Sequence, residues 1–296
     1  MMSQRTTARP PHAGARIRLR AGAAHLLPAA GVPEGMVAGA FSVLSPGTER
    51  RHLTGPGRDA GYMTLGQTGE AWVLAPVPHG AAFDPAHQGA VRTSPGTSVE
   101  VAALARFQQM AHLGLDRVPA AELDGALVVG SGPVALGCVL ELHRRGATNV
   151  RVVTSRRHAP IGRAPGVTCV APGGPATGRL VIDAAGDPLR AAALTVPGGV
   201  LGLLGTPEAT ATLPAVEVHR AGWTVVGMHE LAALSTDAYQ GAYSTSAAFL
   251  TDRLAPELLA SWCRRVPGVR APELYALLGG AGRPAEPVVV FDWRTA

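Results

Sequence analysis

The chain has no lysine, few aromatic residues and no long apolar run, and each shortage excludes a class of protein. All 26 basic residues are arginine, aromatic residues make up 4% of the 296 positions, and the formal net charge is +5. The arginines form only short clusters without interleaved aromatic side chains, so we expect no nucleic-acid partner. No apolar run reaches the roughly 18 residues that a membrane-spanning helix needs, so we expect no membrane partner either.

Cysteines are few, and a signal peptide is missing. The three cysteines, Cys138, Cys169 and Cys263, stand far apart and form neither a Cys-x-x-Cys pair nor a Cys/His cluster. This spacing excludes a disulfide framework and a conventional zinc motif. The N-terminus is polar and rich in proline, without the apolar segment of a secretory signal peptide. We therefore expect a cytoplasmic protein whose residues 1–15 form a disordered tail.

The remaining residues fall into two kinds of pattern. From 16 to 117, short apolar stretches alternate with Gly/Pro turns, which is typical of a β domain, and the first expected helix is 98–115. After Pro119, strands alternate with helices, which favours an α/β fold with a doubly wound parallel sheet. The expected strands are 125–130, 149–154, 179–184, 198–204 and 223–228, with a further one at 166–171, and the expected helices are 133–145 and 187–195.

Two later regions depart from a regular alternation. Four prolines interrupt 155–178, so the helix that usually follows the second strand of such a sheet is expected to be short or missing. Towards the C-terminus, 244–265 is expected to be helical with a break at 254–256. A short helix at 272–278 and a strand at 287–293 should follow.

The segment 126–137 is the most informative in the chain. Its apolar strand leads into Gly130-x-Gly132-x-x-Ala135, and a helical pattern follows. The first glycine allows a tight turn, the second lets a pyrophosphate approach the backbone, and the small third residue lets the helix pack on the strand. The helix begins at Pro133 and Val134, and its first turn presents free N–H groups to phosphate from Val134 onward. This order predicts a dinucleotide-binding loop.

Four segments resemble the medium-chain dehydrogenase/reductase superfamily, which includes alcohol dehydrogenases and quinone reductases. They are the Ser-Pro-Gly-Thr-Glu turn at 45–49, the loop at 130–135, and the segments 181–205 and 219–227. The resemblance implies a nicotinamide cofactor and an active site between two domains. The implied domains are a GroES-like β domain over 16–117, a Rossmann dinucleotide-binding domain over 118–255, and a segment 256–296 that returns to the first domain.

The residues that hold the catalytic zinc in this superfamily are missing. Zinc members use two cysteines and a histidine and leave a fourth position open. Aligned with them, this chain has Pro46 at the first cysteine and Gln67 at the histidine, and no cysteine precedes Cys138. Proline and glutamine cannot replace a thiolate and an imidazole, so we expect no zinc. The turn at 45–49 is similar to that of zinc-less members, among them enzymes that oxidise the hydroxyethyl group of a bacteriochlorophyllide.

Thr48, Glu49 and Tyr62 are the candidate catalytic residues. Thr48 aligns with the hydroxyl that relays the substrate proton in zinc members, and Glu49 aligns with an aspartate of that family. Tyr62, like His52 and His79, is a further candidate for proton transfer. Each has a structural alternative, because Thr48 can bond its own turn, Glu49 can form a buried ion pair, and the others can be ordinary core or surface residues.

The cofactor choice depends on the end of the second Rossmann strand. NAD-selective sheets place an acidic residue there to hold the ribose 2′-OH. Here the strand is followed by Thr154, Ser155, Arg156 and Arg157, which can bind a 2′-phosphate and favour NADP(H) over NAD(H), although two solvated arginines are the alternative. The expected cofactor-binding residues are Gly130, Gly132, Pro133, Val134, Thr154, Ser155, Arg156, Arg157 and Gly205.

Two functions fit these observations. The first is a zinc-independent, NADP(H)-dependent oxidoreductase that transfers hydride to or from a small carbonyl, enone or alcohol, in line with a biosynthetic role in specialised metabolism. The second is a degenerate dehydrogenase fold without catalysis that binds a peptide or a partner protein. By analogy with the superfamily, we expect a homodimer through the edge of the Rossmann sheet at 223–228.

Overall fold

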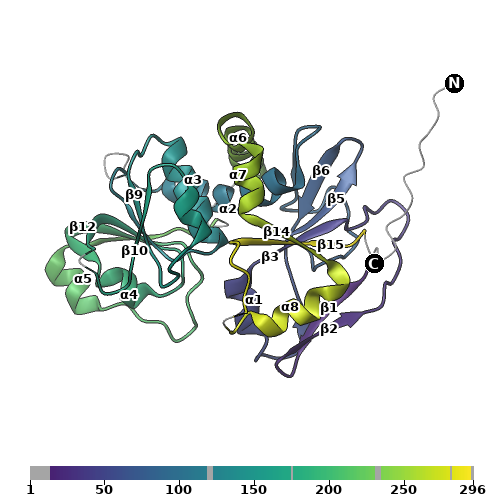
Figure 1. The fold of residues 1–296 in the computed structure, drawn as a ribbon, viewed down its shortest axis with the longest axis horizontal. Coiled ribbons are helices and arrows are strands. Elements are labelled where there is room, and N and C mark those ends of the chain that lie inside the picture. Colours follow the sequence, from purple (N-terminus) through teal and green to yellow (C-terminus); the bar gives the residue numbers. More distant parts are fainter. Residues whose placement is uncertain (1–13, 119–122, 175, 231–234, 281, 295–296) are drawn as a thin grey trace. The chain divides into compact units, whose positions relative to one another are not determined.

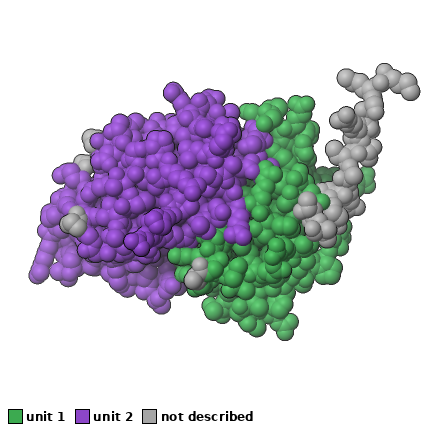
Figure 2. All heavy atoms as spheres, viewed as in Figure 1, with its two compact units in different colours: residues 1–96, 265–284, 289–296 green, residues 97–264, 285–288 purple. Residues whose placement is uncertain are grey.

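A computed structural model describes residues 14–118, 123–174, 176–230, 235–280 and 282–294, and it divides into two compact units (Figure 2). Unit 1 contains 1–96, 265–284 and 289–296, and unit 2 contains 97–264 and 285–288. The expected boundary at 117 therefore differs from the observed one, because the helix at 99–115 packs within unit 2. The C-terminal segment expected at 256–296 likewise enters unit 1 only from Arg265.

Most of the expected N-terminal tail, 1–15, lies outside the described residues. Its last two residues belong to unit 1, in contrast to the expectation. The Gly14 amide donates a hydrogen bond to the Gly80 carbonyl oxygen at 3.1 Å, and the side chain of Ala15 is only 3% exposed.

Unit 2 is built on a six-stranded parallel sheet in the order β10-β9-β8-β11-β12-β13 (Figure 1). Counted along the chain this is the order 3-2-1-4-5-6 of a doubly wound Rossmann fold, so the expected fold class is confirmed. The strands are β8 (Leu127–Val129), β9 (Val150–Val153), β10 (Val167–Val170), β11 (Gly178–Asp183), β12 (Thr195–Leu203) and β13 (Thr224–Gly227).

Two long helices of unit 2 pack closely together because one of them carries a glycine at the contact. α2 (Val99–Leu115) lies against α3 (Pro133–Arg144) and α6 (Thr236–Arg253). A Cβ atom at Gly137 would lie 2.3 Å from the carbonyl oxygen of Phe107. Ser98 caps α2 as its side chain accepts a hydrogen bond from the Val101 amide, in agreement with the predicted helix start.

The helix that usually follows the second strand is missing from the described residues of the proline-rich segment 155–178, as predicted. Between β9 and β10 there is only a 3₁₀ turn, η2 (Pro160–Arg163), and the described residues between β10 and β11 contain no helix. The remaining helices of unit 2 are α4 (Pro188–Ala192), α5 (Ala215–Ala221) and α7 (Pro256–Ser261). α4 is therefore shorter than the helix expected at 187–195.

The expectation of a helix over 244–265 is only partly right. α6 begins earlier, at Thr236, where Ser235 caps it by accepting a hydrogen bond from the Ala238 amide. The predicted break is present, since Leu254 and Ala255 adopt extended conformations before α7. Beyond α7 the chain forms β14 (Cys263–Pro267), because these residues pair with a neighbouring strand in a sheet.

Unit 1 contains two sheets. The smaller has the order β2-β1-β4, and the larger has the order β14-β15-β3-β5-β6-β7, in which β15 pairs antiparallel with β3. The strands not yet given are β1 (Arg16–Arg20), β2 (Ala23–Leu27), β3 (Phe41–Leu44), β4 (Arg58–Asp59), β5 (Thr64–Thr68), β6 (Ala71–Ala75), β7 (Val91–Arg92) and β15 (Val288–Asp292). Its helical elements are α1 (Pro46–His52), η3 (Gly268–Arg270) and α8 (Ala271–Leu277).

α1 was not expected, because no helix was predicted before 98. The Ser-Pro-Gly-Thr-Glu turn opens this helix, with Pro46 in its first turn and Glu49 among its first residues. α8 packs against β2, and its residues Leu274 and Tyr275 share a core cluster with Ile17 and Leu19 of β1. None of the helices in the described part of the chain combines the length and hydropathy that a membrane span requires.

Candidate functional site

The predicted dinucleotide loop connects β8 to α3 in the way its glycines suggest. Gly130 has φ +117°, a conformation that favours glycine, and its amide donates to the Val153 carbonyl oxygen of β9 at 3.0 Å. A Cβ atom at Gly132 would meet nothing within 4 Å. Gly132 is also the N-cap of α3 and provides no side-chain cap, so the helix N-terminus remains available to an anion.

A hydroxyl pair joins this loop to the end of β9. Thr154, 7% exposed, donates from Oγ1 to Ser131 Oγ at 2.8 Å and accepts from the Arg156 amide at 3.1 Å. These bonds hold the first residues after β9 beside the loop. Gly130, Gly132 and Thr154, and the α3 residues Pro133 and Val134, are thus at the same end of the parallel strands.

The two arginines after β9 have different surroundings. Arg156 is half-buried, and its Nη1 donates to the Ala285 carbonyl oxygen at 3.0 Å. Arg157 is exposed, as is Ser155. A further hydrogen bond orders the segment that follows. The fully buried Trp262 donates from Nε1 to the Pro160 carbonyl oxygen at 2.9 Å.

Gly205 lies after β12 and has a packing role. A Cβ atom there would lie 2.6 Å from the Gly186 amide nitrogen, and the Gly205 amide donates to the Asp183 carbonyl oxygen at 2.7 Å. Asp183 was not singled out from the sequence, although it ends β11. Its Oδ1 accepts from the Ala185 and Gly186 amides at 2.9 Å, and burial raises its pKa.

Unit 1 contains a buried carboxylate network centred on Glu49. Its Oε1 accepts from the Ser45 amide at 2.9 Å, and its Oε2 accepts from His79 Nε2 at 2.9 Å and from the Tyr275 hydroxyl. Because a carboxylate only accepts, the histidine must carry a proton on Nε2. Glu49, His79 and Tyr275 are at most 2% exposed.

The partners of Glu49 keep it ionised despite its burial. Burial alone would raise the pKa of Glu49, but the charge interaction with His79 and the hydrogen bonds from His79, Tyr275 and Ser45 hold that pKa below its ordinary value. Phe291 packs edge-on to the His79 ring at 5.2 Å and stacks on the Tyr275 ring at 6.3 Å. Glu49 therefore fixes the start of α1 to distant parts of unit 1.

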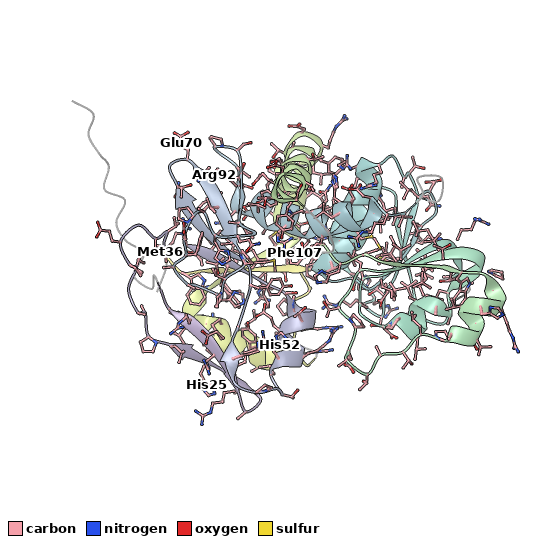
Figure 3. All side chains as sticks on the ribbon, turned by 180° about the vertical axis from the view of Figure 1, so that it is seen from behind. His25, Met36, His52, Glu70, Arg92 and Phe107 are labelled. Carbon is pink, nitrogen blue, oxygen red and sulfur yellow. The ribbon has the colours of Figure 1, made fainter. Side chains whose placement is uncertain are left out.

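The other predicted residues of unit 1 are on α1 or just before β5. Thr48 is half-buried, and its Oγ1 is 3.5 Å from Ser45 Oγ. Tyr62 is half-buried just before β5. His52 ends α1 (Figure 3) and lies 3.3 Å from Arg58 Nη1, where partial burial and the positive charge of Arg58 lower its pKa.

The residues aligned with zinc ligands do not form a metal site. Pro46 begins α1, and Gln67 is an exposed residue of β5. Among the described residues there is no group of three or more His, Cys, Asp or Glu side chains that could hold a metal ion.

No protein-family model matches the chain, and no curated protein matches it. Solved structures do. An alcohol dehydrogenase from Thermus sp. ATN1 superimposes with a TM-score of 0.73 at 15% identity, covering 94% of this chain and 99% of the other. A short chain alcohol dehydrogenase from E. coli CFT073, complexed with NADH, gives 0.69 at 13% identity, with 94% and 98% covered.

A third structure, the yhdH oxidoreductase from Salmonella enterica in complex with NADP, gives a TM-score of 0.66 at 18% identity, with 94% of this chain and 99% of that chain covered. At these identities the likeness concerns the fold. Together with the strand order of unit 2 and the antiparallel sheets of unit 1, it shows that the chain has the fold of these dehydrogenases and oxidoreductases.

Proposed function

We propose that the chain is a zinc-independent, NADP(H)-dependent oxidoreductase that transfers hydride to or from a small carbonyl, enone or alcohol. The observation that carries this proposal is the open glycine loop of unit 2. It combines an unobstructed Gly132, an uncapped α3 N-terminus and a tight turn at Gly130. The NADH and NADP of two similar structures support a nicotinamide ligand at this loop.

The residues after β9 favour the phosphorylated cofactor. No acidic side chain stands between Thr154 and His158 to bind a ribose 2′-OH or to repel a 2′-phosphate. Arg157 and Ser155 are exposed and available to a phosphate. Arg156 is already bonded to Ala285, so we assign it a supporting role and give the direct contact to Arg157.

The bound nicotinamide would supply the hydride chemistry. Residues of unit 1 must then transfer the proton and donate a hydrogen bond to the substrate oxygen. We propose the hydroxyl groups of Thr48 and Tyr62 for these roles. Glu49 is buried and its oxygens are occupied, so we propose that it positions the neighbouring Thr48. Without a zinc ligand set, enone reduction is favoured over simple alcohol oxidation, because conjugation spreads the developing negative charge.

Nucleotide titration tests this proposal directly. Calorimetry of the full chain with NADPH and NADH should show binding of both, with NADPH tighter. Arg157→Ala should weaken NADPH binding by roughly tenfold and leave NADH binding unchanged, as expected for loss of one charged hydrogen bond. Arg163→Ala is the matched control, because Arg163 is also exposed in unit 2. Failure of both nucleotides to bind at millimolar concentration would reject the oxidoreductase.

A second candidate is a degenerate dehydrogenase fold that binds a peptide or partner protein. It is favoured by the short connections around β10, whose Thr168 and Cys169 are exposed. A sheet with so little cover at one edge offers backbone groups to another strand. The titration above distinguishes the two, since a binding module of this kind needs no nucleotide.

We also propose that the chain forms a homodimer through β13. This strand is the outer strand of the unit 2 sheet, and Val225 and Val226 are both half-buried. The adjacent α5 has no buried residue, and Val216 is 55% exposed. Sedimentation velocity should show a dimer that Val226→Arg converts to a monomer; a wild-type monomer would reject this assembly.

A further inference from the structure

The hairpin formed by β1 and β2 in unit 1 carries a row of arginines on one face. Ile17 and Leu19 are fully buried, so the alternation of a strand directs Arg16, Arg18 and Arg20 to the opposite face. His25 of β2 is directly opposite Arg18 in the antiparallel register and is exposed on the same face (Figure 3).

The positive charge of this face is only partly compensated. Asp59 is opposite Arg18 on β4, and its two oxygens accept from Arg16 Nη1 at 3.1 Å and Arg18 Nη1 at 3.2 Å. Within the described residues, the side chain of Arg20 has neither a hydrogen bond nor an ion pair. Like charges side by side on a strand are unfavourable, so an additional anion would stabilise this face.

The same face contains a hollow of about 530 Å³ lined by Arg18, Arg20, Leu27 and Gly57. Gly57 borders the side chain of Arg20, because a Cβ atom there would lie 3.9 Å from the Cβ and Cγ atoms of Arg20 and 3.7 Å from the Leu19 carbonyl oxygen. Arg18 Nη2 also donates to the Gly57 carbonyl oxygen at 3.4 Å. The side chains of Arg18 and Arg20 therefore border this hollow together with Gly57.

The turn that ends β1 is held in place. Ala21 and Gly22 have φ +51° and +79°, which is the conformation of a tight hairpin turn. The Gly22 amide donates to the Leu53 carbonyl oxygen, just after α1, at 2.9 Å. The backbone that carries Arg20 is thus fixed before a ligand binds, which lowers the cost of ordering it.

We propose that this hollow binds the phosphate group of a small phosphorylated molecule. The fork-shaped donors of Arg18 and Arg20 match phosphate oxygens, and Leu27 contacts the carbon part of the ligand. The site lies wholly within unit 1 and does not depend on the nicotinamide proposal. The carboxylate of Asp59 already bonds Arg16 and Arg18 and leaves Arg20 to the ligand.

The test uses the full chain with methyl-labelled leucine, titrated with glucose 6-phosphate at constant ionic strength. The Leu27 methyl resonances, assigned with Leu27→Val, should shift in a saturable way. Glucose should produce no shift, and inorganic phosphate should compete for the same site. Competition by inorganic phosphate would show that the phosphate group provides the binding. A shift with glucose 6-phosphate but not with inorganic phosphate would show that the sugar also contributes to binding. A Leu27 signal that does not move with either anion overturns the proposal.

Three variants locate the site. Arg20→Gln should weaken binding by roughly tenfold or more. Gly57→Glu should abolish it by placing a carboxylate in the hollow, and Gly57→Gln separates the effect of volume from that of charge. Arg163→Gln in unit 2 should change nothing. Melting temperatures identify variants that do not fold. Unchanged binding in folded Arg20→Gln and Gly57→Glu overturns the assignment. If a variant does not fold, the Leu27 titration of the unsubstituted chain and its glucose control decide the proposal.

Discussion

Among the described residues, each unit buries one glutamate completely, and the two are neutralised in different ways. Glu49 of unit 1 is bonded by His79 and Tyr275, which are 30 and 226 residues away in the sequence. Glu141 of unit 2, on α3, is bonded mainly by Arg144 and Arg145, three and four positions later in the chain, and it also accepts from Gln108 Nε2 of α2 at 3.2 Å. Both carboxylates are at most 1% exposed.

The difference lies in what the partners can do when the carboxylate is lost. The side chains of Arg144 and Arg145 are 26% and 17% exposed, so they can turn towards water. His79 and Tyr275 have no such route, and His79 Nδ1 already lacks a hydrogen-bond partner among the described residues. The buried charge of Glu49 therefore depends on partners that are themselves fully buried, whereas that of Glu141 is held mainly by two arginines that can reach water.

Of the substitutions that test this difference, Glu49→Ala should lower the free energy of unfolding most. It leaves a buried histidine and a buried tyrosine unpaired, which costs about 3–5 kcal/mol in the free energy of unfolding. Hydrogen exchange in urea, read separately on peptides of the two units, should show the loss in unit 1. Glu141→Ala is the control and should cost less. An equal or larger loss in Glu141→Ala would contradict the distinction.

Tyr275→Phe should have the next largest effect. It removes one hydroxyl from a charged acceptor, and such hydrogen bonds contribute about 1.5–3 kcal/mol. Tyr243→Phe is the matched control, because that hydroxyl is equally buried in unit 2 but donates to the neutral Ala102 carbonyl oxygen at 3.0 Å. Urea unfolding of both variants gives the two free energies. A smaller loss in Tyr275→Phe would mean that Glu49 is not ionised.

The same contrast shows what the sequence could predict. The glycine loop was predictable because a strand, two glycines and a helix lie within one short segment, and the parallel sheet was predictable from the alternation of strands and helices after it. The Ser-Pro-Gly-Thr-Glu turn at 45–49, which aligns with a zinc-ligand turn of the superfamily, was also identified from the sequence, and Glu49 is its last residue. Tyr275 was not, because no spacing rule links a residue of α1 to one in α8.

Local patterns also misassigned two elements. α1 was missed because it is seven residues long and opens with Pro46 and a glycine. Residues 263–265 were expected to be helical, but they belong to β14 (Cys263–Pro267), because this segment pairs with a strand in a sheet of unit 1. Both errors arise where contacts distant in sequence outweigh local preference.

Glu49 should also make unit 1 sensitive to acid. Its pKa in the folded chain is below the ordinary value of 4.5, so folding favours the charged form. The resulting stability is complete above the unfolded pKa and is lost as pH falls through the folded value, at about 1.4 kcal/mol for each unit of pKa difference. Unfolding free energies measured from pH 7 to pH 3 should fall less steeply in Glu49→Gln. Parallel curves for the two proteins would show that Glu49 has no such role.

Asp116→Ala should have the smallest effect and marks the outer limit of the Glu141 network. Asp116 accepts from Arg145 Nη2 at 2.6 Å, but its side chain is 54% exposed. Arg145 retains its bonds to Glu141 and to the His112 carbonyl oxygen when Asp116 is removed. An exposed pair of this kind contributes about 0–1 kcal/mol and weakens with salt. Urea unfolding at low and high salt should show a small loss that disappears at high salt. A loss of unfolding free energy that persists at high salt would contradict this, because it would mean that Asp116 is needed to hold the arginines of Glu141 in place.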